Sequence, residues 1–164
     1  MDVSRLAEEF DREAGATRVM LERLPADRFA WTPHPKSFTA GALASHLVDC
    51  IRWADPILTA AEFNVDPATF RPFHADTPSA LLAGFDAAVA AGRDGLATAT
   101  PETLESPWRL LVRGTMRFER PRVVVLRDFT LSHLAHHRGQ LSVYLRLLDV
   151  PVPGVYGPSA DDRP

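Results

Sequence analysis

The spacing of hydrophobic residues along the chain predicts four long amphipathic helices. In the first of them, apolar side chains from Leu6 to Leu24 recur at steps of three and four residues, which places them on one face of a helix. The four predicted helices cover residues 3–24, 40–62, 78–98 and 121–148. Because the apolar faces have to be buried against one another, the pattern predicts an all-α fold, a four-helix bundle with long connections between its helices.

The segments between these helices contain many residues that favour turns. In the first connection, Pro25 ends the first helix and Thr39 is a suitable N-cap for the second. Residues 64–79, rich in proline and aspartate, read as a long connection across the bundle. Residues 99–120 fit either a short hairpin or an irregular crossover, and this choice stays open from the sequence.

Two further features concern the second helix and the tail. Pro56 lies inside the second predicted helix and is expected to kink or split it. The tail after residue 149 carries several prolines and glycines, and we expect it to fold back over the bundle at least as far as Tyr156. No internal repeat or linker separates two units, so residues 1–164 are expected to form a single domain.

The composition of the chain disfavours several functional classes of protein. The formal net charge is -3, so no overall basic surface favours nucleic acid. No stretch approaches the roughly 20 apolar residues that span a bilayer, and the amino-terminal residues lack the apolar run of a signal peptide. The single cysteine, Cys50, cannot form an internal disulfide. We therefore expect a cytoplasmic protein without a nucleic-acid or membrane partner.

A cluster of histidines in the last predicted helix is the most distinctive chemical feature. His133 and His137 are four residues apart, so their side chains differ by about 40° in direction and about 6 Å in height and can converge on one ion. Helical zinc sites use the same spacing. Both histidines lie on the predicted apolar face, where an imidazole without a partner is costly, and one metal ion would satisfy both.

The remaining ligands are open from spacing alone. His136 could also pair with His133, but it is rotated toward the edge of the apolar face, which favours His137. His46 is the best third ligand because it lies on the apolar side of the second helix, although it could equally be a core histidine hydrogen-bonded to a neighbour. Cys50, one turn after His46, could supply a thiolate ligand, but a single cysteine on an apolar face is more often a core residue.

Two stretches of the sequence carry recognisable motifs. The first, RFAWTPHPKSFTAGALASHLVD, contains Trp-x-Pro and then Leu-x-x-His-Leu; the second, LSHLAHHRGQLSVYLRLLDVPVPGVYGPSADD, contains HHRGQ and a Pro-Gly-x-Tyr-Gly-Pro ending. In these motifs and in their order the chain resembles the DinB/YfiT-like family over nearly its whole length. The resemblance implies a four-helix bundle, usually a homodimer, that binds one metal ion through His46, His133 and His137. It also implies relatives among thiol-dependent enzymes, such as mycothiol-dependent isomerases and bacillithiol S-transferases.

Three neutral imidazoles would leave a divalent ion its full charge and an open position, as in catalytic sites. Zinc or nickel is the expected metal, and iron, manganese or cobalt also accept such ligands. One hypothesis is a thiol-dependent S-transferase, with a low-molecular-weight thiol as cosubstrate for a small-molecule substrate. A second is a metal-dependent hydrolase, and a third is a non-catalytic metal-binding stress-response protein.

Carboxylates and arginines near the histidines are weaker candidates. Asp49 and Asp128 could orient a ligand histidine or move a proton, although each could also be an exposed helix charge. Arg138 and Arg146 could bind the carboxylates of a thiol cosubstrate or simply be solvated. The sequence assigns no catalytic residue, and whether the protein is an enzyme stays open.

Overall fold

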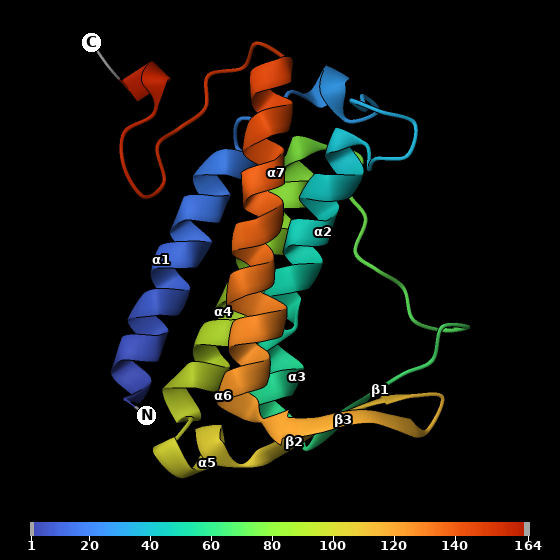
Figure 1. The fold of residues 1–164 in the computed structure, drawn as a ribbon, viewed down its shortest axis with the longest axis vertical. Helices are drawn as coiled ribbons and strands as arrows, with labels where there is room; N and C mark the ends of the chain where they lie inside the picture. The colour runs from blue at the N-terminus through green and yellow to red at the C-terminus, as the bar shows by residue number, and fades with distance from the viewer. Residues whose placement is uncertain (1, 163–164) are drawn as a thin grey trace.

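The computed structural model describes residues 2–162 and is dominated by long helices that run side by side (Figure 1). The longest helices are α1 (Val3–Leu21), α2 (Ala40–Arg52), α4 (Pro78–Thr98) and α7 (His133–Leu147). The shorter helices are α3 (Ala54–Thr59), α5 (Pro101–Glu105) and α6 (Arg122–Val125), with 3-10 turns at Ala26–Arg28 and Ala160–Asp162 and a π-helical segment at Leu126–Ser132. None of the described helices is long and apolar enough to cross a lipid bilayer.

A three-stranded sheet at one end of the helices shows that the predicted all-α four-helix bundle is wrong (Figure 1). Its strands are β1 (Glu62–Val65), β2 (Pro107–Val112) and β3 (Thr115–Pro121). Strand β2 lies in the middle, parallel to β1 and antiparallel to β3. The fold is therefore mixed, with strands in segments that were expected to be a helix end and a connection.

Strands β2 and β3 form a tight hairpin, which was one of the two alternatives for residues 99–120. The two residues of its turn, Arg113 and Gly114, have φ angles of 51° and 73°. Positive φ at both positions is the two-residue turn whose twist matches that of the paired strands. The Gly114 amide donates to the side-chain oxygen of Asn64 at 3.0 Å, which ties the turn to β1.

The second predicted helix is split, and the break has a simple cause. Helix α2 ends at Arg52, exactly four residues before Pro56, and α3 then continues from Ala54 to Thr59. Proline has no N–H to donate to the carbonyl four residues earlier, so the continuous hydrogen-bond ladder stops there. The start of α2 is as expected, because the Thr39 hydroxyl accepts from the Ala42 amide at 3.1 Å.

The hydrophobic core lies between the helices and extends to the sheet. Trp108 on β2 is fully buried, and its indole N–H donates to the carbonyl of Pro56 at 3.0 Å. The largest other side chains in the core are Phe10, Phe85, Leu6, Met20, Leu21, Leu43, Leu47, Ile51, Ile57, Leu81 and Leu104. Trp108 therefore joins the sheet to the α2–α3 break and fixes the orientation of both.

The carboxy-terminal tail packs back over the helices, as expected from the sequence (Figure 1). The Tyr156 hydroxyl donates to a carboxylate oxygen of Glu13 at 2.7 Å, and the guanidinium of Arg138 donates to the same oxygen at 2.8 Å. Glu13 and Arg138 are only 6% and 3% exposed, so this is a buried ion pair. Three distant segments, α1, α7 and the tail, are joined at this point.

Candidate metal centre

The structure brings together the three histidines that were expected to bind a metal. His46 projects from the middle of α2, and His133 and His137 project from the first two turns of α7, which runs beside α2 (Figure 1). The Nε2 atom of His133 lies 3.4 Å from Nε2 of His46 and 2.9 Å from Nε2 of His137. All three rings are partly buried, so they are shielded from bulk water without being sealed from it.

These separations fit nitrogen ligands of one ion. Two nitrogens that each lie about 2.0–2.1 Å from one zinc ion are about 3.3 Å apart at a tetrahedral angle and about 2.9 Å apart at a right angle. The two measured separations, 3.4 and 2.9 Å, match these values. Each of these two pairs therefore fits two nitrogen ligands of one divalent ion.

The outer nitrogen of one of the rings already has a partner. The Nδ1 atom of His137 is 2.7 Å from the side-chain oxygen of Gln140, and that oxygen can only accept, so Nδ1 carries the proton. For His133, the backbone of Phe129, four residues earlier, acts to raise the pKa against the stronger effect of burial.

This hydrogen bonding fixes the role of the inner nitrogen of His137. With Nδ1 protonated, its Nε2 atom is an acceptor and lies 2.9 Å from the Nε2 atom of His133. Outer hydrogen bonds that fix the tautomer of a ligand histidine are typical of metal sites.

Burial keeps the three imidazoles in the form that binds metals. Burial is the main cause that lowers the pKa of His46, His133 and His137, and repulsion between the histidines lowers it further. The hydrogen bond from His137 to Gln140 opposes this effect in part. At neutral pH the cluster therefore presents neutral nitrogens, which are the metal-binding species.

Cys50 also lies at this site. Donor atoms of His46, Cys50 and His133 all lie within 4.8 Å of one another, so these three residues form a group that could hold a metal ion. Cys50 is 1% exposed, and burial raises the pKa of its thiol to about 12. A neutral buried thiol is a poor ligand. The distances thus admit Cys50 as a possible ligand, but its burial disfavours the thiolate form that binds a metal.

His136 lies beside the cluster but faces outward. It is exposed, and its Nε2 atom is 3.0 Å from the side-chain nitrogen of Gln140. Gln140 therefore bridges the two rings, accepting from His137 and donating to His136. The sequence favoured His137 over His136 because of the apolar face, and the structure places the two rings as this argument expects.

Both candidate carboxylates have hydrogen-bond partners other than a ligand histidine, although the charge of Asp49 acts to raise the pKa of His46. Asp49 accepts from the backbone amide of Phe73 with both oxygens, at 3.0 and 3.1 Å, and pairs with Arg52 at 3.2 Å. Asp128 is half-exposed and lies 3.4 Å from Arg120. Within residues 2–162, neither carboxylate has a hydrogen bond to a ligand histidine, so neither is placed to orient one.

The two arginines of the last helix are engaged in holding the tail. Arg138 is buried against Glu13, and Arg146 pairs with Asp161 at 2.6 Å. Both are therefore structural in this fold. The sequence did not reveal the contact of Phe38, whose ring centroid lies 5.8 Å from that of His46. Phe38 belongs to a connection, where no periodicity predicts the direction of a side chain.

Comparisons with known proteins agree with this architecture. The family model described as "DinB family" matches residues 1–163. The uncharacterized protein YrdA of Bacillus subtilis (strain 168) is 29% identical over 153 residues, which cover 92% of this chain and 85% of YrdA.

Two solved structures share the fold. A DinB-like protein from Bacillus cereus ATCC 10987 aligns with a TM-score of 0.69 at 22% identity, covering 91% of this chain and 94% of that one. The DinB-like protein YjoA from Bacillus subtilis aligns with a TM-score of 0.68 at 17% identity, covering 90% and 95% of the two chains. At these identities the likeness concerns the fold alone.

Proposed function

Because this chain belongs to the DinB family, we propose that it binds one divalent metal ion through His46, His133 and His137. The observation that carries the proposal is the approach of the His133 Nε2 atom to the Nε2 atoms of His46 and His137, at 3.4 and 2.9 Å. The hydrogen bond between His137 and Gln140 supports it, because it leaves the Nε2 lone pair of His137 free for a metal ion. Zinc or nickel suits such a set of imidazoles best, and iron, manganese or cobalt also accept it.

The surrounding residues have distinct tasks in this proposal. Gln140 holds the ring of His137 and fixes its tautomer. The Phe38 ring lies beside that of His46, with the ring centroids 5.8 Å apart. A bound divalent ion would supply a Lewis acid with an open position, where a water or thiol loses its proton more readily.

We further propose that the protein is an enzyme of the thiol-dependent S-transferase type. Three neutral histidines leave the charge of the ion uncompensated, and the rings are only partly buried, so a small thiol can reach the site. The metal-dependent hydrolase and the non-catalytic metal-binding protein are the alternatives. The assays below distinguish all three. A homodimer is expected from the family resemblance and is tested by the mass in solution.

Metal content of purified variants tests the ligand set. We expect His46→Ala, His133→Ala and His137→Ala each to lose most of the bound metal, because three ligands hold the ion. His136→Ala is the matched control on the same helix, and Cys50→Ala is the control for the buried thiol; both should keep nearly full metal content. A full metal complement in the three ligand variants, or loss only in Cys50→Ala, would refute the proposed set.

Turnover tests the enzymatic part separately. The metal-loaded protein is incubated with an electrophile and glutathione, bacillithiol or mycothiol, and conjugation is followed beside ester hydrolysis. We expect thiol conjugation that disappears in His133→Ala. Hydrolysis without conjugation would favour the hydrolase. Tight metal binding, a large rise in thermal stability with metal and no turnover would favour the non-catalytic protein.

A further inference from the structure

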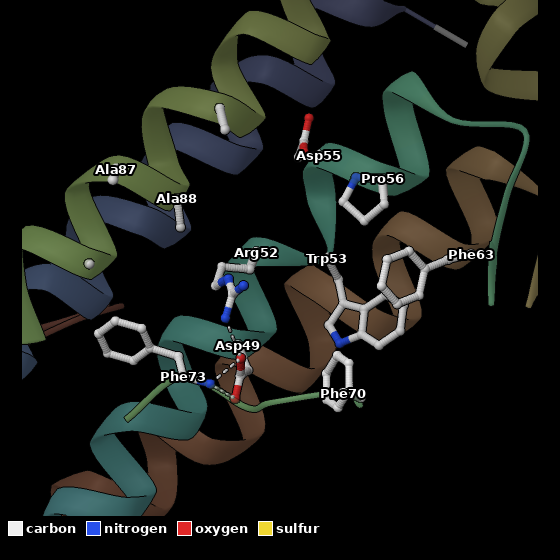
Figure 2. Close-up of a pocket in the computed structure, with 12 residues that line it drawn as sticks. Asp49, Arg52, Trp53, Asp55, Pro56, Phe63, Phe70, Phe73, Ala87 and Ala88 are labelled. Atoms are coloured by element: carbon white, nitrogen blue, oxygen red, sulfur yellow. Dashed lines mark hydrogen bonds and ion pairs between the residues drawn. The ribbon is translucent and has the colours of Figure 1, made fainter. Parts of the chain in front are cut away.

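A second site lies beside α2 and is lined by residues other than the histidines. It is a pocket of about 490 Å³ between α2, α3 and α4, bounded by β1 and the segment of residues 66–77 (Figure 2). This volume falls within the range of pockets that bind small molecules. None of its lining residues is a proposed metal ligand, so the argument for this pocket does not rest on the proposed function.

The two walls of the pocket differ in kind. One wall is the small-residue face of α4, formed by Gly84, Ala87, Ala88 and Ala91. The opposite wall is aromatic. Figure 2 shows the rings of Trp53, Phe63 and Phe70 gathered on that side, with Phe73 across the pocket from them. A space between flat rings and small aliphatic residues suits a flat apolar molecule.

The segment that supplies Phe70 and Phe73 is fastened in place. The Phe73 amide donates to both carboxylate oxygens of Asp49, and the Ala75 amide donates to the buried hydroxyl of Ser45 at 3.1 Å. The Phe73 ring lies so close to Gly84 that a Cβ there would be 2.3 Å from its Cζ. The segment that carries Phe70 and Phe73 is therefore anchored to both α2 and α4.

The charges at the pocket favour a cation. Two carboxylates, Asp49 and Asp55, and one guanidinium, Arg52, line it. Arg52 pairs with Asp49, and Asp55 accepts from the Thr59 hydroxyl at 3.3 Å but has no ion pair within residues 2–162. One negative charge is therefore left over. Aromatic ring faces also attract cations and contribute about 0.5–1 kcal/mol at exposed sites.

We propose that this pocket binds an organic ammonium compound, with a flat apolar body between α4 and the aromatic wall and its charged nitrogen near Asp55. The body would displace water from the apolar walls, and the ammonium group would compensate the unpaired carboxylate. Arg52 stays with Asp49, whose charge would repel a ligand carboxylate that approached the guanidinium.

Isothermal titration with three indole probes of matched shape tests the proposal. Tryptamine carries an ammonium group, tryptophol a hydroxyl and indoleacetate a carboxylate. We expect the wild-type protein to bind tryptamine at least about fivefold more tightly than tryptophol, as one cation–aromatic or ion-pair contact of roughly 1 kcal/mol implies. Indoleacetate should bind more weakly than both.

Two variants with matched controls place the binding in this pocket. Ala87→Trp fills the pocket from α4 and should abolish tryptamine binding, whereas Ala90→Trp changes an exposed alanine on the same helix outside the pocket and should not. Asp55→Asn should remove the preference for tryptamine over tryptophol, and Asp94→Asn, at an exposed acid outside the pocket, should keep it. Circular dichroism confirms that each variant is folded.

Several results would overturn the proposal. No saturable binding of any probe to the wild-type protein would do so, and so would tighter binding of indoleacetate than of tryptamine. Unchanged tryptamine binding in folded Ala87→Trp would place the ligand elsewhere. An unchanged preference in Asp55→Asn would remove the charge argument on which the ligand class depends.

Discussion

The buried ion pair between α1 and α7 allows a prediction whose magnitude follows from the structure. Arg138→Met removes the guanidinium and keeps a side chain of similar length. The substitution abolishes the 2.8 Å ion pair with Glu13 and two 3.1 Å hydrogen bonds, to the Glu13 carbonyl and the Thr17 hydroxyl. The Glu13 side chain, 8% exposed, keeps its hydrogen bond from Tyr156 and a looser 3.6 Å ion pair with the exposed Arg12.

The cost of this change is dominated by the charge that is left behind. Removing one partner of a buried ion pair typically costs about 3–5 kcal/mol, because the remaining charge is desolvated without compensation. For a chain of this size, each kcal/mol lowers the melting temperature by roughly 2–4 °C. We therefore expect Arg138→Met to melt roughly 6–20 °C below the wild-type protein at neutral pH.

The pH dependence of the free energy of unfolding tests whether the buried charge of Glu13 causes the loss of stability. In the wild-type protein, burial alone would raise the pKa of Glu13, but hydrogen bonds from Tyr156 and Arg138 outweigh it and hold the pKa below its usual value. This group therefore stabilises the fold above its unfolded pKa, about 4.3, and the contribution is lost as the pH falls through the lower folded pKa. Without Arg138, burial should raise the pKa of Glu13, so protonation relieves the buried charge.

Urea denaturation followed by circular dichroism, at neutral pH and at about pH 4.5, measures both effects. The stability deficit of Arg138→Met should shrink at the lower pH. The double variant with Glu13→Gln should be more stable at neutral pH than Arg138→Met alone, because it contains no buried charge. A deficit below about 1 kcal/mol, or one that is equal at the two pH values, would refute the reasoning.

Two other predictions follow from single contacts. A Cβ at Gly92 would lie 2.5 Å from the fully buried ring of Phe10, so Gly92→Ala should lower the free energy of unfolding by about 1–3 kcal/mol. A Cβ at Gly15 would have nothing within 4 Å, so Gly15→Ala should raise the free energy of unfolding by about 0.5–1 kcal/mol in the same urea assay. Equal effects of the two glycine substitutions would contradict the packing argument. If the proposed metal is bound, Gln140→Leu should weaken its affinity by about 10–100-fold in a chelator competition, because the Nδ1 partner of His137 is lost; unchanged affinity would exclude that role.

The sequence predicted the parts of the fold that depend on local signals. Helix α4 covers the predicted residues 78–98, and Thr39 caps α2 as expected. The sheet was missed because its decisive pairing is not local. Strand β1 has only four residues, and its partner β2 lies more than forty residues further along the chain. No turn between them signals the contact, as it does for a hairpin.

The candidate site, like the fold, has a part that local sequence signals predicted and a part that they did not. The pairing of His133 and His137 is local to one helix, and their spacing was informative. The position of His46 against them depends on how α2 packs on α7, which periodicity suggested only as far as the buried face. The role of Asp49 could not be predicted, because its partner is the backbone amide of Phe73 and any residue type except proline would supply that N–H.

The π-helical segment Leu126–Ser132 joins the sheet to the histidines, and its geometry determines how they are oriented to each other. Its hydrogen bonds span five residues instead of four, so it contains more residues than an α-helical segment with the same number of turns. If the same residues were α-helical instead, everything before them would rotate relative to α7, because each residue turns an α-helix by about 100° and a π-helix by less. Strand β3 would then leave its partner or His133 would turn away from His46. The two ends of the molecule are thus coupled through helical phase, and the π-helical conformation of this segment determines that phase.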